Sequence, residues 1–103
     1  MNFKEMAAKL GLETHEFKEI VSFFIDNAIS DISRFKDALR QGDGEKASTS
    51  AHSLKGSSGN LGFSDIHELA KQAEKDSGNN DFESCKTVVS MIEEKIEEIN
   101  KNL

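Results

Sequence analysis

The chain lacks proline, tryptophan and tyrosine, and it contains a single cysteine, Cys85. Because proline disrupts helices, its absence from 103 residues favours long helices joined by short turns. One cysteine cannot form an internal disulfide, which fits a reducing compartment such as the cytoplasm. No segment approaches the roughly 18 consecutive apolar residues of a membrane-spanning helix, and the N-terminus lacks the apolar run of a signal peptide. We therefore expect a cytoplasmic protein without a membrane partner.

Basic residues are also few, with 13 Lys and Arg against 19 Asp and Glu, and the formal net charge is -6. Binding to nucleic acid needs a clustered basic face, so we exclude nucleic acid as a partner. A phosphate-binding GxxxxGK[ST] loop and a metal-ligating set are both missing, which argues against a nucleotide or metal site. We expect one monomeric domain over residues 1–103, with a single core and no large enclosed cavity.

Apolar residues recur every three or four positions in five segments, and no segment alternates with a period of two. This periodicity predicts a short helix over about 2–10, a long helix over about 15–41, and helices that begin after Asp43, Ser64 and Asn80. Thr14, Asp43 and Asn80 are the expected N-caps, the last with Glu83 in a capping box. Short joins force antiparallel neighbours, so we expect an all-α, up-down-up-down four-helix bundle that the first helix caps at one end.

The stretch SAHSLKGSSGNLG, residues 50–62, combines a helical pattern with glycines that weaken a helix. His52 lies about 140° from the centre of the apolar stripe and should face solvent. Each interior glycine costs roughly 1 kcal/mol relative to alanine, so Gly56 and Gly59 require a reason. With Ser48 and Lys55 they surround His52, and their small size would let a partner's backbone approach the imidazole. The face around His52 is therefore a candidate docking surface.

The chemistry of this face suits a phosphoryl group. Neutral imidazole is a good nucleophile near neutral pH. The ammonium of Lys55, one turn further on, disfavours the protonated ring and would pair with an anion placed on it. Without a nucleotide site the chain could accept and hold a phosphoryl group, but it could not generate one.

The run AHSLKGSSGNLG resembles the histidine-containing phosphotransfer (HPt) domain, a family that relays phosphate in multistep bacterial two-component signalling. His52, Lys55, Gly56 and Gly62 match the pattern HxxKGxxxxxG in full, and the likeness extends over essentially the whole chain. Two positions depart from the family: Phe63, where alanine is common, and Ala73, where leucine is common. Both are expected in or near the core, away from the phosphate chemistry.

The resemblance implies roles for particular residues. His52 would carry the phosphoryl group, Lys55 would help to neutralise it, and Gly56 would let a receiver domain approach. In related domains of chemotaxis kinases, a carboxylate on the next helix bonds the other ring nitrogen. Glu74 is the matching residue here, with Lys71 one turn before it. Any Mg²⁺ would come from the partner receiver.

Four other residues need an interpretation. His15 and His67 have no companions for a metal site, so both are expected to be ordinary surface residues. Cys85 falls on an apolar stripe and should be a buried, inert thiol. Phe23 lies well off its helix's stripe. We favour packing of Phe23 against the helix at 2–10, and its alternative role is an exposed apolar spot for receiver docking.

Three functions fit these features. The first is a carrier without its own enzymatic activity, which relays phosphate between response-regulator receiver domains or from a hybrid sensor histidine kinase. The second is the N-terminal phosphorylated domain of a chemotaxis-type histidine kinase, loaded from ATP by a separate catalytic domain. The third is a helical adaptor in which His52 is incidental.

Overall fold

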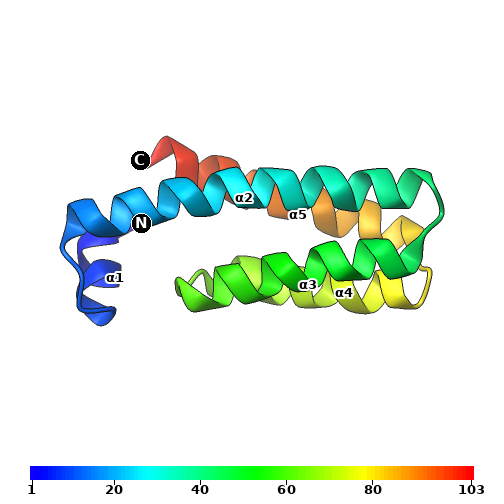
Figure 1. Cartoon of the computed structure of the whole chain (residues 1–103), viewed down its shortest axis with the longest axis horizontal. Coiled ribbons are helices and arrows are strands. Elements are labelled where there is room, and N and C mark those ends of the chain that lie inside the picture. The colour runs from blue at the N-terminus through cyan, green and yellow to red at the C-terminus, as the bar shows by residue number, and fades with distance from the viewer.

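Five helices and no strand make up the computed structural model, which describes all 103 residues. The four long helices run antiparallel along one axis, and α1 packs across one end of the bundle (Figure 1). The prediction of an all-α bundle with a short N-terminal helix is confirmed. In chain order the helices are α1 (Phe3–Lys9), α2 (Thr14–Arg40), α3 (Gly44–Asn60), α4 (Ser64–Gly78) and α5 (Phe82–Lys101).

Side-chain caps stand at the starts of α1, α2, α3 and α5 but not of α4, and two of them differ from the sequence prediction. Asp43 caps α3 as expected, because its carboxylate accepts a hydrogen bond from the Lys46 backbone N–H at 3.0 Å. α2 is preceded by Glu13 in extended conformation, so Thr14 is already its first helical residue. Asn80 adopts a left-handed conformation with φ 59°, and this turn makes Asp81 the residue that caps α5. The predicted caps at Thr14 and Asn80 were wrong for these reasons.

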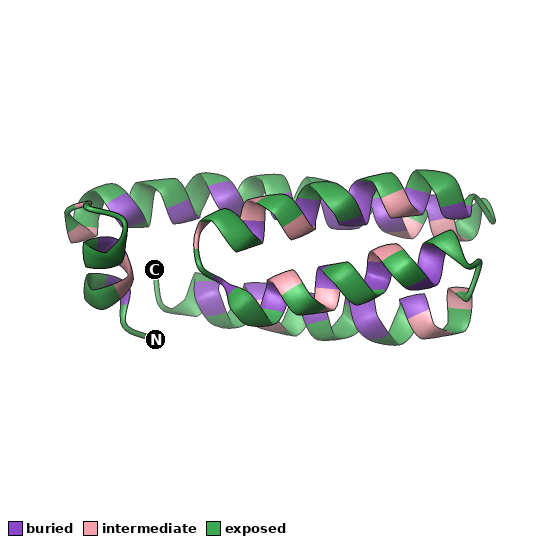
Figure 2. Ribbon diagram, turned by 90° about the horizontal axis from the view of Figure 1, so that it is seen from below, coloured by how far each residue is buried: buried purple, intermediate pink, exposed green.

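The core is built from the inward faces of the four long helices, with Phe3 and Ala7 of α1 closing one end (Figure 2). The periodic apolar residues of the helices supply most of it, but three of them, Leu10, Ile20 and Leu103, are exposed at 45%, 38% and 40%. Leu10 follows the last residue of α1, and Ile20 lies at the margin of the α2 stripe. Position on a stripe thus predicts burial less well near its margins and at helix ends.

The two residues that depart from the HPt pattern both lie in the core, as expected. Phe63 stacks on Phe24 of α2 with ring centroids 5.3 Å apart, and Ala73 is 1% exposed. Cys85 of α5 is fully buried, which confirms the predicted burial of that thiol. The larger side chain at 63 therefore fills space between the α3–α4 turn and α2.

α3 lies close against α4 because small residues stand where the two helices meet. Gly44 is the first residue of α3, and a Cβ there would overlap the Ser77 carbonyl oxygen and the Asn80 side chain. Ala47, Ala51 and Ser58 continue this small, buried surface along α3. The close approach sets α4 side chains directly beside the outer face of α3.

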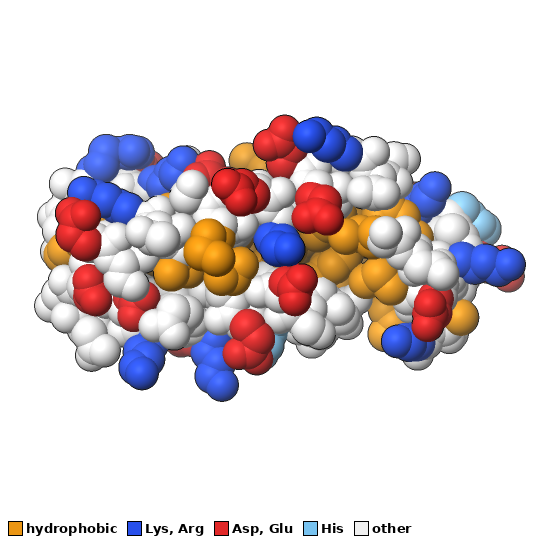
Figure 3. Space-filling view, turned by 180° about the vertical axis from the view of Figure 1, so that it is seen from behind, with side chains coloured by type: hydrophobic (Ala, Val, Ile, Leu, Met, Phe, Trp, Pro, Cys, Tyr) orange, Lys and Arg blue, Asp and Glu red, His pale blue; other side chains and the backbone are white.

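The face formed by α4 and α5 carries charges of both signs around apolar side chains (Figure 3). A separate groove between α2 and α5 is lined by four isoleucines, Ile25, Ile29, Ile32 and Ile96. Ile29 is the most exposed of these isoleucines, at 56%. None of the five helices combines the length and the apolar character needed to cross a bilayer.

Candidate functional site

His52 projects from the outer face of α3, and its side chain is 68% exposed. The prediction that the ring faces solvent is confirmed. One turn further on, a Cβ at Gly56 would meet no atom within 4 Å, so the surface beside the ring is open there. A partner could approach the imidazole from this side without moving any side chain of α3.

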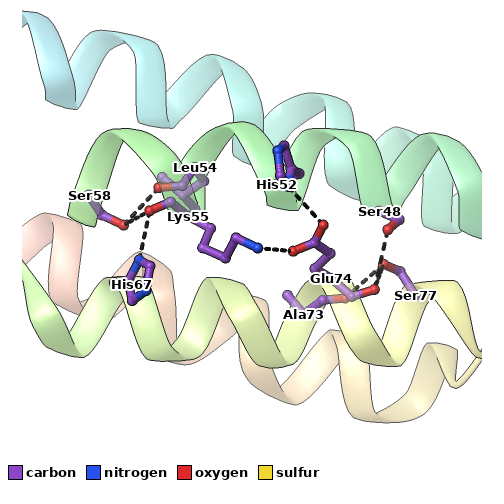
Figure 4. Close-up of polar contacts among 9 residues, drawn as sticks. All are labelled: Ser48, His52, Leu54, Lys55, Ser58, His67, Ala73, Glu74 and Ser77. Atoms are coloured by element: carbon purple, nitrogen blue, oxygen red, sulfur yellow. Dashed lines mark hydrogen bonds and ion pairs between the residues drawn. The ribbon is translucent and has the colours of Figure 1, made fainter. Parts of the chain in front are cut away.

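Glu74 of α4 connects the two polar side chains of the predicted motif (Figure 4). Its Oε2 lies 2.9 Å from His52 Nδ1, and its Oε1 lies 2.7 Å from Lys55 Nζ. An ionised carboxylate only accepts hydrogen bonds, so Nδ1 must carry the hydrogen. In the neutral ring Nε2 then keeps its lone pair and is the available nucleophile. The contact between Glu74 and Nδ1 is present as expected.

The electrostatics keep Glu74 ionised. The hydrogen bond from Lys55 lowers the pKa of Glu74 most, and the bond from His52 adds to this, while partial burial acts in the opposite direction. Lys55 is itself three-quarters buried and paired with this carboxylate. The lysine expected to meet an incoming anion is therefore held next to the ring through Glu74.

Backbone contacts hold Glu74 in place. Its carbonyl oxygen accepts a hydrogen bond from Ser48 Oγ across the helix interface at 3.3 Å, and another from Ser77 Oγ at 3.1 Å. Ser48 was singled out as a docking residue, whereas its hydroxyl is used within the protein. The sequence could not reveal this contact, because it depends on how α3 and α4 cross.

Gly59 also has an internal reason for its small size. A Cβ at this position would lie 2.8 Å from Nδ1 of His67, whose ring fills the space. His67 is half-buried, and its Nδ1 lies 2.9 Å from the carbonyl oxygen of Lys55. The prediction that His67 is an ordinary surface residue was wrong, since α4 directs its ring onto α3. Of the two interior glycines of α3, only Gly56 borders open space that no side chain fills.

The Hpt domain family model matches residues 19–102, from the first turns of α2 to the end of α5. The chain belongs to the Hpt domain family. Among curated proteins and among solved structures, no significant match was found. Hpt domains serve as histidine phosphotransfer modules in phosphorelays, where they carry phosphate and interact with receiver domains or kinases.

On this Hpt domain the remaining predicted residues lie on α4 and on α2. Lys71 is exposed and lines a hollow of polar residues on the α4 side, together with Lys55 and Lys75. Phe23 of α2 is 69% exposed, so the favoured prediction that it packs against α1 was wrong. α1 reaches α2 at Phe17, whose ring centroid lies 5.9 Å from that of Phe3, and leaves Phe23 uncovered.

No three His, Cys, Asp or Glu side chains of this Hpt domain gather closely enough to hold a metal ion. His15 is exposed at the start of α2, in agreement with its prediction as a surface residue. The side chains of His52, Lys55 and Glu74 converge on the outer surface of α3 and α4, and the function proposed below rests on their chemistry.

Proposed function

We propose that His52 of this Hpt domain is the phosphoryl carrier, which takes phosphate from the aspartate of one receiver domain and gives it to a second receiver. The observation that carries the proposal is an exposed imidazole whose Nδ1 is bound by Glu74, which leaves Nε2 as the free nucleophile. In this proposal residues 1–103 form one monomeric, cytoplasmic unit without catalytic activity of its own.

Loading begins when the Nε2 lone pair of neutral His52 attacks the phosphorus of the aspartyl phosphate. The bond between phosphorus and the aspartate oxygen breaks, and the aspartate leaves as a carboxylate. The phosphorylated ring keeps its hydrogen on Nδ1 and carries positive charge, which the ionised Glu74 stabilises from 2.9 Å away. Transfer to a second receiver reverses these steps. Mg²⁺ would be held by the receiver and not by this chain.

The other residues would help a receiver domain to dock and would neutralise the charge of the phosphoryl group. Lys55, already beside Glu74, would neutralise part of the phosphoryl charge, and Lys71 adds a second ammonium on the α4 side. Gly56 offers an open surface, and exposed Phe23 offers apolar area on α2. Ser48 and Gly59 are occupied by contacts with α4, so we assign receiver docking to Phe23, Gly56 and Lys71.

The test is a transfer assay with a receiver domain phosphorylated on aspartate. The wild-type chain should acquire a label that is stable in base and labile in acid, as expected for phosphohistidine. His52→Gln should acquire none. His15→Gln, which removes an exposed histidine from α2, should be labelled like the wild type. Label that persists in His52→Gln would refute the assignment, and so would a wild type that no receiver or kinase labels.

A second candidate is the phosphorylated domain of a chemotaxis-type kinase. The carboxylate contact between Glu74 and Nδ1 favours it, because related kinase domains resemble this chain at that residue. Incubation with ATP and the catalytic domain of such a kinase separates the two functions. Labelling of His52 by the kinase and not by receivers would support the second candidate. If partners bind His52→Ala normally and no phosphate ever transfers, an adaptor role would remain.

A further inference from the structure

In the hydrogen bond between His67 and α3, the donor and the acceptor can be assigned. His67 Nδ1 lies 2.9 Å from the Lys55 carbonyl oxygen, and a carbonyl can only accept. Nδ1 of His67 therefore carries a hydrogen and donates it. In a regular helix that carbonyl also accepts from the Gly59 N–H, and its second lone pair is available for His67. Ser58 Oγ lies 3.1 Å from the same oxygen, but its one hydrogen can go to the nearer Leu54 carbonyl oxygen at 2.7 Å. The imidazole thus bonds the backbone of α3 without breaking the helix.

Gly59 and His67 depend on each other. The missing Cβ of Gly59 leaves the space that the His67 ring occupies, and Figure 4 shows this ring directed from α4 toward the Lys55 carbonyl. A glycine in a helix interior weakens the helix, so the sequence sacrifices local stability to admit this ring. A merely solvated histidine would not need such a space.

The consequence for the site lies at Lys55, which α4 holds at two points. His67 binds its carbonyl oxygen, and Glu74 binds its ammonium at 2.7 Å. His67 and Glu74 are seven residues apart on α4, which places them on the same face two turns from each other. The same Glu74 carboxylate binds His52 Nδ1. A slide of α4 along α3 would therefore break both Lys55 contacts and the His52 contact together.

We propose that His67, with Gly59 providing its space, is a positioning residue for phosphotransfer by His52. Its hydrogen bond fixes α4 along α3 so that Glu74 falls opposite Nδ1 and Lys55 stays beside it. This inference rests on the proposed function of His52. It assigns to His67 no contact with the phosphoryl group.

Two substitutions of His67 separate the effect of its hydrogen bond from the effect of its side-chain volume. The Nδ2 of asparagine occupies nearly the place of the histidine Nδ1, and asparagine has a similar helix propensity, so His67→Asn can keep the bond to the Lys55 carbonyl. His67→Leu fills the space but has no donor. We expect His67→Leu to lower the rate constant of transfer at saturating receiver roughly tenfold or more, because small misplacements of reacting groups are costly. His67→Asn should stay within about threefold of the wild type, and neither variant should change the receiver concentration that half-saturates the reaction.

The spectroscopic readout is the ¹⁵N NMR spectrum of the His52 ring in the unphosphorylated protein. The wild type and His67→Asn should show Nδ1 protonated and Nε2 bare. His67→Leu should shift the His52 signals toward a mixture of tautomers, because Glu74 no longer stays opposite Nδ1. This readout does not require transfer, so it tests positioning even if the proposed function of His52 fails in the labelling assay.

A substitution at Gly59 tests the pairing from the other helix. Gly59→Ala should disturb the His52 signals as His67→Leu does, because the new methyl group displaces the His67 ring. In a His67→Ala background, Gly59→Ala should cause no further change, since the ring is no longer there. If His67→Leu folds and keeps wild-type tautomer signals and transfer rate, or if His67→Asn is as impaired as His67→Leu, the positioning role is refuted.

Discussion

Gly56 and Gly59 lie three residues apart on α3 and have opposite surroundings. A Cβ at Gly56 would meet nothing within 4 Å, whereas one at Gly59 would contact the His67 ring at 2.8 Å. The two glycines look alike in the sequence pattern, but the structure needs each of them for a different reason. One glycine leaves the surface open toward solvent, and the other admits a side chain from a neighbouring helix.

This difference gives a prediction for Gly56→Ala. Because alanine is the better helix former and no clash arises, the free energy of unfolding should rise by about 1 kcal/mol. Receiver-dependent transfer should become slower, because the methyl group stands on the proposed docking surface. Urea unfolding and the labelling assay measure the two effects. A stabilised variant with unchanged transfer at every receiver concentration would remove Gly56 from that surface.

Glu74 gives a prediction about pH. Its pKa in the folded protein is lowered from the ordinary value of 4.5, chiefly by Lys55 and then by His52. A lowered pKa stabilises the fold above the unfolded-state value, and this stabilisation is lost as the pH falls through the folded-state value. Glu74→Gln should therefore lower the free energy of unfolding by about 1 kcal/mol at neutral pH. The difference should shrink steadily below pH 4.5.

Urea titrations of both proteins across this acid range provide the measurement. Glu93→Gln is the control, since Glu93 of α5 forms an ion pair with Lys36 of α2 and contacts neither His52 nor Lys55. A gap between wild type and Glu74→Gln that stays constant below pH 4.5 would contradict the ionic role of Glu74.

At the scale of elements, the pairing of α3 with α4 determines the site. Gly44 and Gly59 bring the two helices together near opposite ends of α3, and Glu74 faces His52 between those points. Side chains of only moderate size can then span the interface, as the hydrogen bond from Ser48 to the Glu74 carbonyl shows. The geometry of the proposed phosphoryl site is therefore a property of the helix pair and not of α3 alone.

Substitution of Gly44 tests this packing. Gly44→Ala should destabilise the protein by about 1–3 kcal/mol, because the methyl group overlaps the Ser77 carbonyl and the Asn80 side chain. Gly56→Ala is the matched control, as it makes the same chemical change on the same helix in open space. The midpoints of thermal and urea unfolding should both fall for Gly44→Ala and both rise for Gly56→Ala. Equal shifts would show that helix propensity, and not contact with α4, governs both positions.

Periodicity in the sequence predicted the bundle because each long helix must bury one stripe. It also predicted the outward direction of His52, which follows from its angle to Ala51 and Leu54 on the same helix. It did not predict the contacts of Gly59, Ser48 and His67, because these depend on the distance and crossing of two helices. The contact of Glu74 with His52 was expected from family resemblance and not from spacing. Phe23 was misjudged because the reach of α1 along α2 is a tertiary property.

At the scale of the whole molecule, Cys85 reports on opening of the core. Burial raises the pKa of the Cys85 thiol to about 11, and the negative charges of Asp76 and Asp81 contribute. A thiol-specific disulfide reagent should therefore react very slowly with the native protein at mildly alkaline pH, and promptly in concentrated urea. A Cys85→Ala/Ser90→Cys variant, with its thiol on the exposed face of α5, should react at once. Rapid reaction of native wild-type protein would contradict the packing described for α5.

The dimensions of the molecule have a consequence for the proposed relay. The bundle measures 42 × 19 × 17 Å, and the exposed imidazole of His52 stands on one long side. A typical interface covers about 800 Å² of each partner, and a footprint of that size centred on His52 would span the full width of the rod. Donor and acceptor must therefore take turns. The residence time of each complex would limit the rate of phosphoryl transfer along the relay. Surplus unphosphorylated acceptor would occupy the surface that the donor must bind, and it would thereby slow the phosphorylation of His52 on which the acceptor itself depends.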